Sequence, residues 1–166
     1  MGEVVPRNAN VRHANGDAVL GDPDVLIQTF RRSLSPAEIN AAYANPIELL
    51  PPPGANSMYL VLGVAMNLRF NTTATANGGT MYIQYGNAPN AAGPYFAVNF
   101  DPKDETYFNA AATSLISGLS PFGFVQAYKP ADVNNLGLYF TNDGAAYTGG
   151  DYFIDLDFFY FKVNTQ

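Results

Sequence analysis

The chain has 166 residues, with eight Lys or Arg against fourteen Asp or Glu, and a formal net charge of −6. This length suits one domain with a sizeable core and is too short for two comfortable ones. The acidic balance argues against a nucleic-acid partner, because phosphate binding needs clustered basic side chains. Only 13% of the residues are charged, and 15 Gly, 12 Pro, 11 Tyr and 12 Phe favour short strands and tight turns over helices.

No cysteine occurs in the chain, which excludes disulfide bonds and cysteine-ligated metal sites. Polar residues follow Met1, and the sequence contains no apolar stretch of signal-peptide length near this end. We therefore expect synthesis in a cytoplasm and no membrane partner.

Residues 1–24 are predicted to form an extended N-terminal arm, ahead of a single β domain that spans residues 25–166. The arm is polar and rich in Asn and Gly, without a sustained apolar period. Arg7 and Arg12 against Glu3 make its first sixteen residues basic, whereas the chain as a whole is acidic. We expect these two arginines to contact an acidic groove of a partner protein.

The first elements of the domain are a strand over residues 25–32 and one short helix that ends near Tyr43. Ser35, Pro36 and Glu38 form a capping-box pattern with proline at the first helical position. Residues 45–50 can form a strand only up to the three prolines and the glycine that follow, because proline removes backbone donors.

A long core strand over residues 58–70 is the clearest prediction, since a period of two is not compatible with a helix. Seven consecutive even positions are apolar, namely Met58, Leu60, Leu62, Val64, Met66, Leu68 and Phe70.

The remaining pattern is typical of antiparallel strands joined by turns. Asn77-Gly78-Gly79 predicts a hairpin that leads into a strand over residues 80–85. Further strands are expected at 95–100, 106–108, 122–128, 136–141 and 151–163, whereas 110–120 is ambiguous between a helical turn and a strand. About eight strands with this spacing predict an all-β fold, an antiparallel jelly-roll-like β-sandwich with one short helix.

The terminal strand is expected to turn its even positions, Tyr152 to Tyr160, toward the core. Its odd face then carries Phe159, Phe161 and Val163 where an isolated sandwich would show water a polar surface. We predict that these three residues bind a partner, because such an apolar patch is normally covered. The alternative is a β-bulge near Asp157 that sends the two phenylalanines inward.

Candidate catalytic and metal-binding groups are few. His13 is the only histidine and lies in the predicted arm, so acid–base or triad chemistry would depend on one arm residue. The acidic clusters lack the spacing of a calcium loop or a glycosidase pair. They are Asp22 with Asp24, Asp101 with Asp104 and Glu105, and Asp155 with Asp157, the last a predicted solvated strip. We expect no enzyme activity, no metal and no cofactor.

One stretch of the chain carries a family resemblance. Residues 45–56 read Asn-Pro-Ile-Glu-Leu-Leu-Pro-Pro-Pro-Gly-Ala-Asn, the long strand follows, and residues 82–86 read Tyr-Ile-Gln-Tyr-Gly. Over residues 37–86 the chain resembles the capsid decoration, or cement, proteins of tailed bacteriophages, which often share this proline-rich turn, long strand and Gly-Gly hairpin.

The resemblance implies a jelly-roll-like subunit on the capsid surface of a virion, made in the host cytoplasm. Its partners would be the major capsid protein and itself, commonly as a homotrimer at local three-fold positions of the lattice. The alternative function is a tail-fibre or lectin-like domain that binds carbohydrate through exposed Tyr, Asn and Asp side chains.

Overall fold

The computed structural model describes residues 27–73, 75–100, 114–118 and 129–164. Every strand pair in these residues is antiparallel. The elements in chain order are β1 (Gln28–Leu34), α1 (Pro36–Ala41), β2 (Ile47–Leu50), β3 (Ser57–Arg69), β4 (Thr75–Asn77), β5 (Met81–Tyr85), β6 (Tyr95–Phe100), β7 (Ser114–Gly118), α2 (Pro130–Val133), β8 (Leu138–Asn142), β9 (Tyr147–Gly149) and β10 (Phe153–Asn164).

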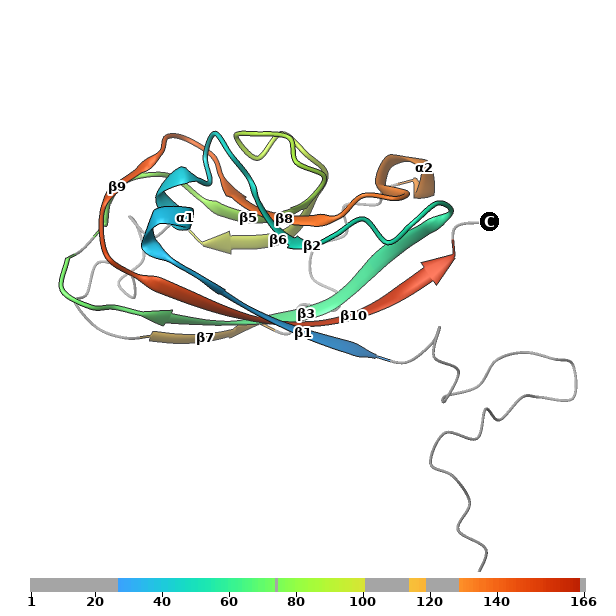
Figure 1. The fold of residues 1–166 in the computed structure, drawn as a ribbon, viewed down its shortest axis with the longest axis horizontal. Coiled ribbons are helices and arrows are strands. Elements are labelled where there is room, and N and C mark those ends of the chain that lie inside the picture. Colours follow the sequence, from blue (N-terminus) through green and yellow to red (C-terminus); the bar gives the residue numbers. More distant parts are fainter. Residues whose placement is uncertain (1–26, 74, 101–113, 119–128, 165–166) are drawn as a thin grey trace, which may run out of the picture.

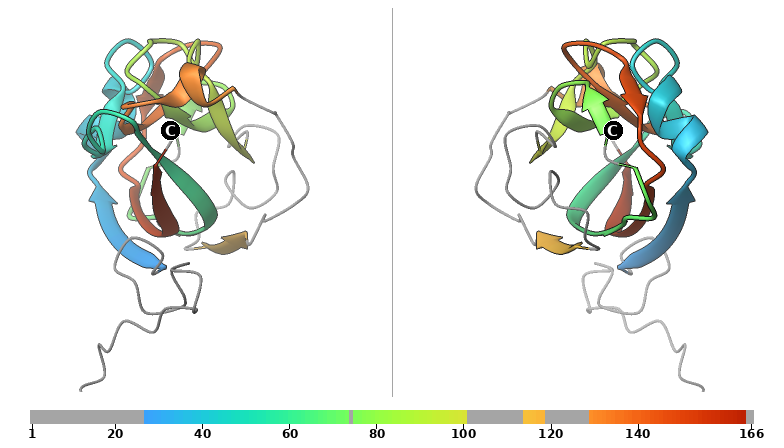
Figure 2. Two further views of the ribbon diagram at one scale, coloured as in Figure 1. Left: turned by 90° about the vertical axis from the view of Figure 1, so that its right-hand side faces the viewer. Right: turned by 90° about the vertical axis from the view of Figure 1, so that its left-hand side faces the viewer.

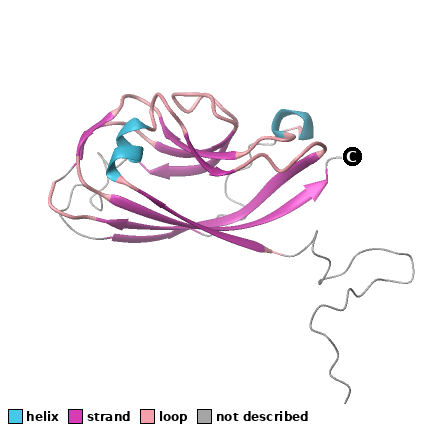
Figure 3. Ribbon diagram, viewed as in Figure 1, coloured by secondary structure: helices cyan, strands magenta, loops and turns pink. Residues whose placement is uncertain are grey.

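Two four-stranded sheets lie one above the other as two layers (Figures 1 and 2). The first sheet has the strand order β1-β10-β3-β7 and the second β2-β8-β5-β6, while β4 and β9 form a two-stranded sheet at one end. The helices are short and peripheral (Figure 3). The described part of the chain is therefore all-β, as the composition predicts.

The hydrophobic core lies between the two layers and draws on both. Its largest fully buried apolar side chains are Leu34, Leu68, Ile154, Leu156 and Phe158 from the first sheet and Ile83, Leu138 and Phe140 from the second.

Helix α1 begins as the sequence predicts. The Glu38 backbone N–H donates to the Ser35 hydroxyl at 3.4 Å, and the Glu38 carboxylate accepts a hydrogen bond from the Ser35 N–H at 2.8 Å. This capping box satisfies backbone donors that a helix start leaves free. The helix buries Ile39 and ends at Ala41, before the predicted Tyr43.

The prediction of a single helix is wrong, because α2 forms a second short one. Lys129 precedes it, Pro130 occupies its first turn, and the Asp132 carboxylate accepts a hydrogen bond from the Lys129 N–H at 3.1 Å. Its last residue, Val133, is buried. Both helices therefore begin with a proline in the first turn and an acidic residue two positions later, which are favoured at helix N-termini.

The prediction that every even position of residues 58–70 points into the core is wrong for the first half of β3. Even positions are buried in the second half. In the first half Leu60 is 46% exposed, and Tyr59 and Val61 are buried instead. The strand therefore reverses its faces partway along.

A β-bulge in β3 causes this reversal. The register with β10 shifts between Phe159 and Tyr160, whose partners are Gly63 and Val61, so Leu62 is an extra residue. An inserted residue exchanges the two faces of the strand beyond it.

The neighbouring strand β10 keeps its alternation of buried even positions as far as Tyr160, and Lys162 and Asn164 beyond it are exposed. Its even positions Tyr152 to Tyr160 are buried as predicted, and Phe159 and Phe161 are half-buried on the other face. The alternative of a bulge near Asp157 in this strand is therefore wrong, since the bulge lies in β3.

The predicted hairpin at Asn77-Gly78-Gly79 is also wrong. The strand before it, β4, pairs with β9, and the strand after it, β5, pairs with β6 and β8. Asn77 and Gly78 both have positive φ, 58° and 88°. The turn thus connects the two-stranded sheet to the second four-stranded sheet.

The remaining predictions differ from the structure in position or concern residues that the structure does not describe. The first strand is β1, which begins at Gln28 and not at residue 25, and the ambiguous stretch 110–120 contains the strand β7. The predicted arm over 1–24 and the strands at 106–108 and 122–128 lie outside the described residues.

Candidate protein-contact surface

The outer face of the first sheet carries apolar side chains at one end. We call Leu60, Phe159, Phe161 and Val163 the apolar outer patch. Leu60 is 46% exposed and the other three are half-buried. Phe161 lies directly opposite Leu60 in the β10–β3 register. Large apolar side chains gathered on one exposed face of a sheet mark a surface suited to contact another protein.

The bulge in β3 brings Leu60 to this face. Without the extra residue, Leu60 would share the inward face of Val64 and Met66, as the even-position pattern predicts. Sequence reasoning therefore missed Leu60 as a surface residue. The available signal was Gly63, because glycine inside a strand often marks a bulge.

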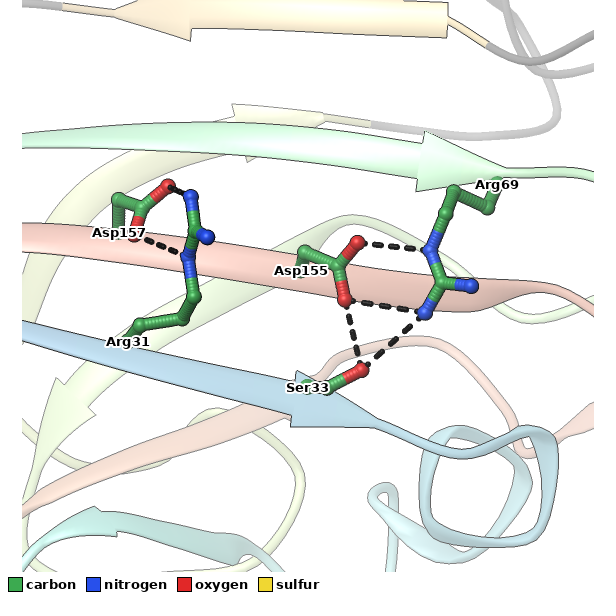
Figure 4. Close-up of polar contacts among 5 residues, drawn as sticks. All are labelled: Arg31, Ser33, Arg69, Asp155 and Asp157. Atoms are coloured by element: carbon green, nitrogen blue, oxygen red, sulfur yellow. Dashed lines mark hydrogen bonds and ion pairs between the residues drawn. The ribbon is translucent and has the colours of Figure 1, made fainter.

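The other end of the same face carries two ion pairs (Figure 4). Phe153, which is 37% exposed, lies beside them with its ring under Arg69. The Arg31 guanidinium donates two hydrogen bonds of 2.7 Å to the Asp157 carboxylate. The Arg69 guanidinium contacts Asp155 at 2.7 and 3.1 Å, and the Ser33 hydroxyl donates to Asp155 at 2.6 Å.

These contacts hold the pKa of both aspartates below the ordinary value. Hydrogen bonds from Arg69 and Ser33 lower the pKa of Asp155, and the bond from Arg31 lowers that of Asp157. Both carboxylates lie on the odd face as predicted, but within ion pairs that bridge β1, β10 and β3. Exposed ion pairs of this kind contribute little to stability, and they leave the face with balanced charge.

Among the described residues, the backbone beside the apolar outer patch has an open edge. The β1–β10 ladder ends at the pair Gln28 and Tyr160, whereas the β10–β3 ladder continues to Asn164. In the described part of the chain, no strand borders residues 161–164 on the side of β1, which diverges from β10 there (Figure 1). An open strand edge offers free N–H and C=O groups for pairing.

A third carboxylate, that of Asp151, joins the segment between β9 and β10 to the segment between β3 and β4. Asp151 accepts hydrogen bonds from the backbone N–H of Thr72 and Thr73, from the Thr72 hydroxyl at 2.6 Å, and from the Asn71 amide. The hydrogen bond from the Thr72 side chain is the main cause that lowers the pKa of Asp151 to about 2, from an ordinary value of 3.8.

We expect Asp151→Asn to lower the melting temperature at neutral pH. A carboxylate with a depressed pKa stabilises the folded state above its unfolded pKa, and this contribution is lost as the pH falls through the folded pKa. The gap in melting temperature between wild type and variant should therefore narrow from about pH 4 to pH 2. Melting curves across this range test it, and a gap that stays constant would show that the charge of Asp151 has no part in the effect.

The described residues hold no group of side chains that could bind a metal ion. No three His, Asp or Glu side chains gather within them as a metal site would require. A cavity between Met81, Tyr147 and Ile154 has a volume of about 10 Å³, which admits one water molecule at most. None of the described helices is long and apolar enough to cross a membrane.

Three of the five predicted partner-binding residues fall on one surface. Phe159, Phe161 and Val163 lie together on the outer face of β10, as the odd-position pattern predicts. Arg7 and Arg12 lie outside the described residues. Partner binding by these five residues stays a prediction.

The fold and this surface define a class, an all-β protein of two layered antiparallel sheets with an apolar patch on one outer face. Comparisons with protein-family models, curated proteins and solved structures found no match to the chain.

Proposed function

We propose that this chain is a virion structural protein, a capsid decoration subunit that binds the major capsid protein lattice and stabilises the shell. The observation that carries the proposal is the apolar outer patch, where Leu60 is 46% exposed beside Phe161. A monomer in water gains stability when such a surface is covered, at about 25 cal/mol per Å² of apolar area. Contact with other proteins is therefore the function that the surface supports.

The capsid assignment itself comes from the resemblance of residues 37–86 to decoration proteins. A jelly-roll connection of the strands, a homotrimeric state and a place on the capsid surface belong to the same proposal. The balanced charge of the outer face is compatible with a contact role. We propose no enzyme activity.

Mass spectrometry of purified virions tests the proposal directly. We expect this chain in particles of the phage that encodes it, at a copy number comparable with that of the major capsid protein. Absence from purified particles would contradict a virion role. A copy number far below that of the capsid protein would instead place the chain in a tail fibre, the alternative function.

A reconstitution experiment tests the stabilising role. Shells that lack this chain should bind purified protein until saturated and then resist a higher temperature before they break. The matched control is the same shell incubated with an unrelated protein of similar charge. Saturable binding without any change in shell stability would contradict the cement function.

A further inference from the structure

We propose that residues 24–27 of the same chain extend β1 along the open edge of β10 and close it. The open edge is the backbone of residues 161–164, which no strand borders on the side of β1 within the described part of the chain. The structure shows the open state, in which Ile27 is 55% exposed. The proposal adds a closed state of the isolated protein, and it does not depend on the proposed function.

The register of β1 against β10 selects this segment. The two strands pair without a shift from Leu34 with Ile154 to Gln28 with Tyr160. The same register, continued by one residue, places Ile27 opposite Phe161. The chain leads directly from the segment into β1, so closing the edge needs no intervening loop and little loop entropy is lost.

The length of the segment matches the length of the edge. Pro23 precedes the segment and has no backbone N–H, so pairing along a strand stops there. Residues 24–27 lie between Pro23 and β1. On the other strand, residues 161–164 are those that pair with β3 beyond the end of the β1 ladder. The segment can therefore fill the whole edge and extend no further.

The two β-branched residues of the segment fall on the face of the apolar outer patch. Odd positions of β1 and β10 lie on this outer face. In the continued register Ile27 lies opposite Phe161 there. By the same count Val25 lies opposite Val163. Directly opposed apolar side chains stabilise antiparallel strands. Pairing along the edge leaves the outer face uncovered, so the closed state widens the patch and keeps it available to a partner protein.

The other face of the extended strand offers a charge pair. Lys162 is exposed on this face, and in the continued register Asp24 lies diagonally across from it. Long side chains at diagonal positions reach each other, and opposite charges there attract. A register shifted by one residue would move Asp24 to the outer face and lose this contact.

Disulfide trapping tests the closed state, because the chain has no cysteine of its own. In the full chain, Val25→Cys combined with Val163→Cys should form an intramolecular disulfide on mild oxidation, since opposed Cβ atoms on one face come within bonding reach. The matched control is Leu26→Cys combined with Val163→Cys, whose side chains would point to opposite faces. The control should oxidise at least about tenfold more slowly, because its Cβ atoms point apart.

Non-reducing electrophoresis and peptide mass spectrometry identify the products. Equal oxidation rates for the two pairs would overturn the proposed register. A disulfide between two molecules, in place of one within the chain, would overturn the assignment of the edge to the chain's own segment.

Hydrogen exchange tests the same closure without cysteines. The amides of residues 161–164 should exchange more slowly in the wild type than in a variant with both Val25→Pro and Leu26→Pro. Neighbouring backbone N–H groups point to opposite edges of a strand, so this pair of prolines removes a donor that faces β10. The matched control is Ala18→Pro with Val19→Pro, on the far side of Pro23, which should leave this exchange unchanged.

Exchange that is equally fast in the wild type and in the Val25→Pro, Leu26→Pro variant would overturn the proposal. Both tests use the isolated protein, so neither result depends on whether it binds shells. The closed edge and the decoration role can therefore fail independently.

Discussion

Replacing Phe158 with alanine is expected to lower the free energy of unfolding by about 3–5 kcal/mol, the usual cost of truncating a fully buried phenylalanine. Phe158 is 0% exposed between the two sheets, and its ring centroid lies 6.4 Å from that of Phe30. The alanine leaves a cavity that the surrounding core can refill only in part. Urea denaturation followed by circular dichroism measures the change.

The next residue supplies the control. Phe159 is half-buried on the outer face, opposite Gly63, so Phe159→Ala should cost about 1 kcal/mol or less. Equal losses for the two variants would contradict the assignment of alternate positions to the core and to the surface.

Gly78→Ala is expected to destabilise the fold by about 2–4 kcal/mol through strain and overlap together. Gly78 has a φ of 88°, and a Cβ atom there would lie 2.0 Å from the ring of Tyr147. Tyr147 is buried and donates a hydrogen bond to the Gly79 carbonyl at 2.5 Å, so its ring cannot move away without losing this bond. Thermal and urea unfolding of the purified variant test the prediction.

Gly54→Ala is the control that separates backbone strain from steric overlap of the added Cβ atom. Its φ of 106° is also positive, but a Cβ atom there would meet nothing within 4 Å. Gly54→Ala should therefore cost about 1–2 kcal/mol from the backbone alone. If both variants lose the same stability, contact with Tyr147 contributes nothing and the position of the turn against β9 is wrong.

Local chemistry made several elements predictable from sequence. The capping residues Ser35 and Glu38 act within one turn of α1, and the alternation of β10 follows from strand geometry alone. For the same reason the outward position of Phe159, Phe161 and Val163 could be derived before any pairing was known.

Pairing between distant segments was not predictable in this way. The bulge at Leu62 exists only in relation to β10, about a hundred residues further along the chain. The turn at Gly78 has the sequence of a hairpin, but β4 pairs with β9. In both cases the local sequence permits two outcomes, and the tertiary partners select one.

For the same reason, only part of the apolar outer patch could be predicted from the sequence. Its β10 members follow a local period, whereas Leu60 joins them only because the bulge reverses β3. The ion pairs Arg31–Asp157 and Arg69–Asp155 likewise link three strands that are remote in sequence. Charge balance on this face could be recognised only in three dimensions.

Strand β2 borders the second sheet and is followed at once by Pro51, Pro52 and Pro53. Proline has no backbone donor, so a foreign strand cannot continue to pair along this edge. The three prolines therefore limit the pairing of a further strand on this side to the four residues of β2. A sheet border that cannot be extended protects a protein against edge-to-edge growth into fibres.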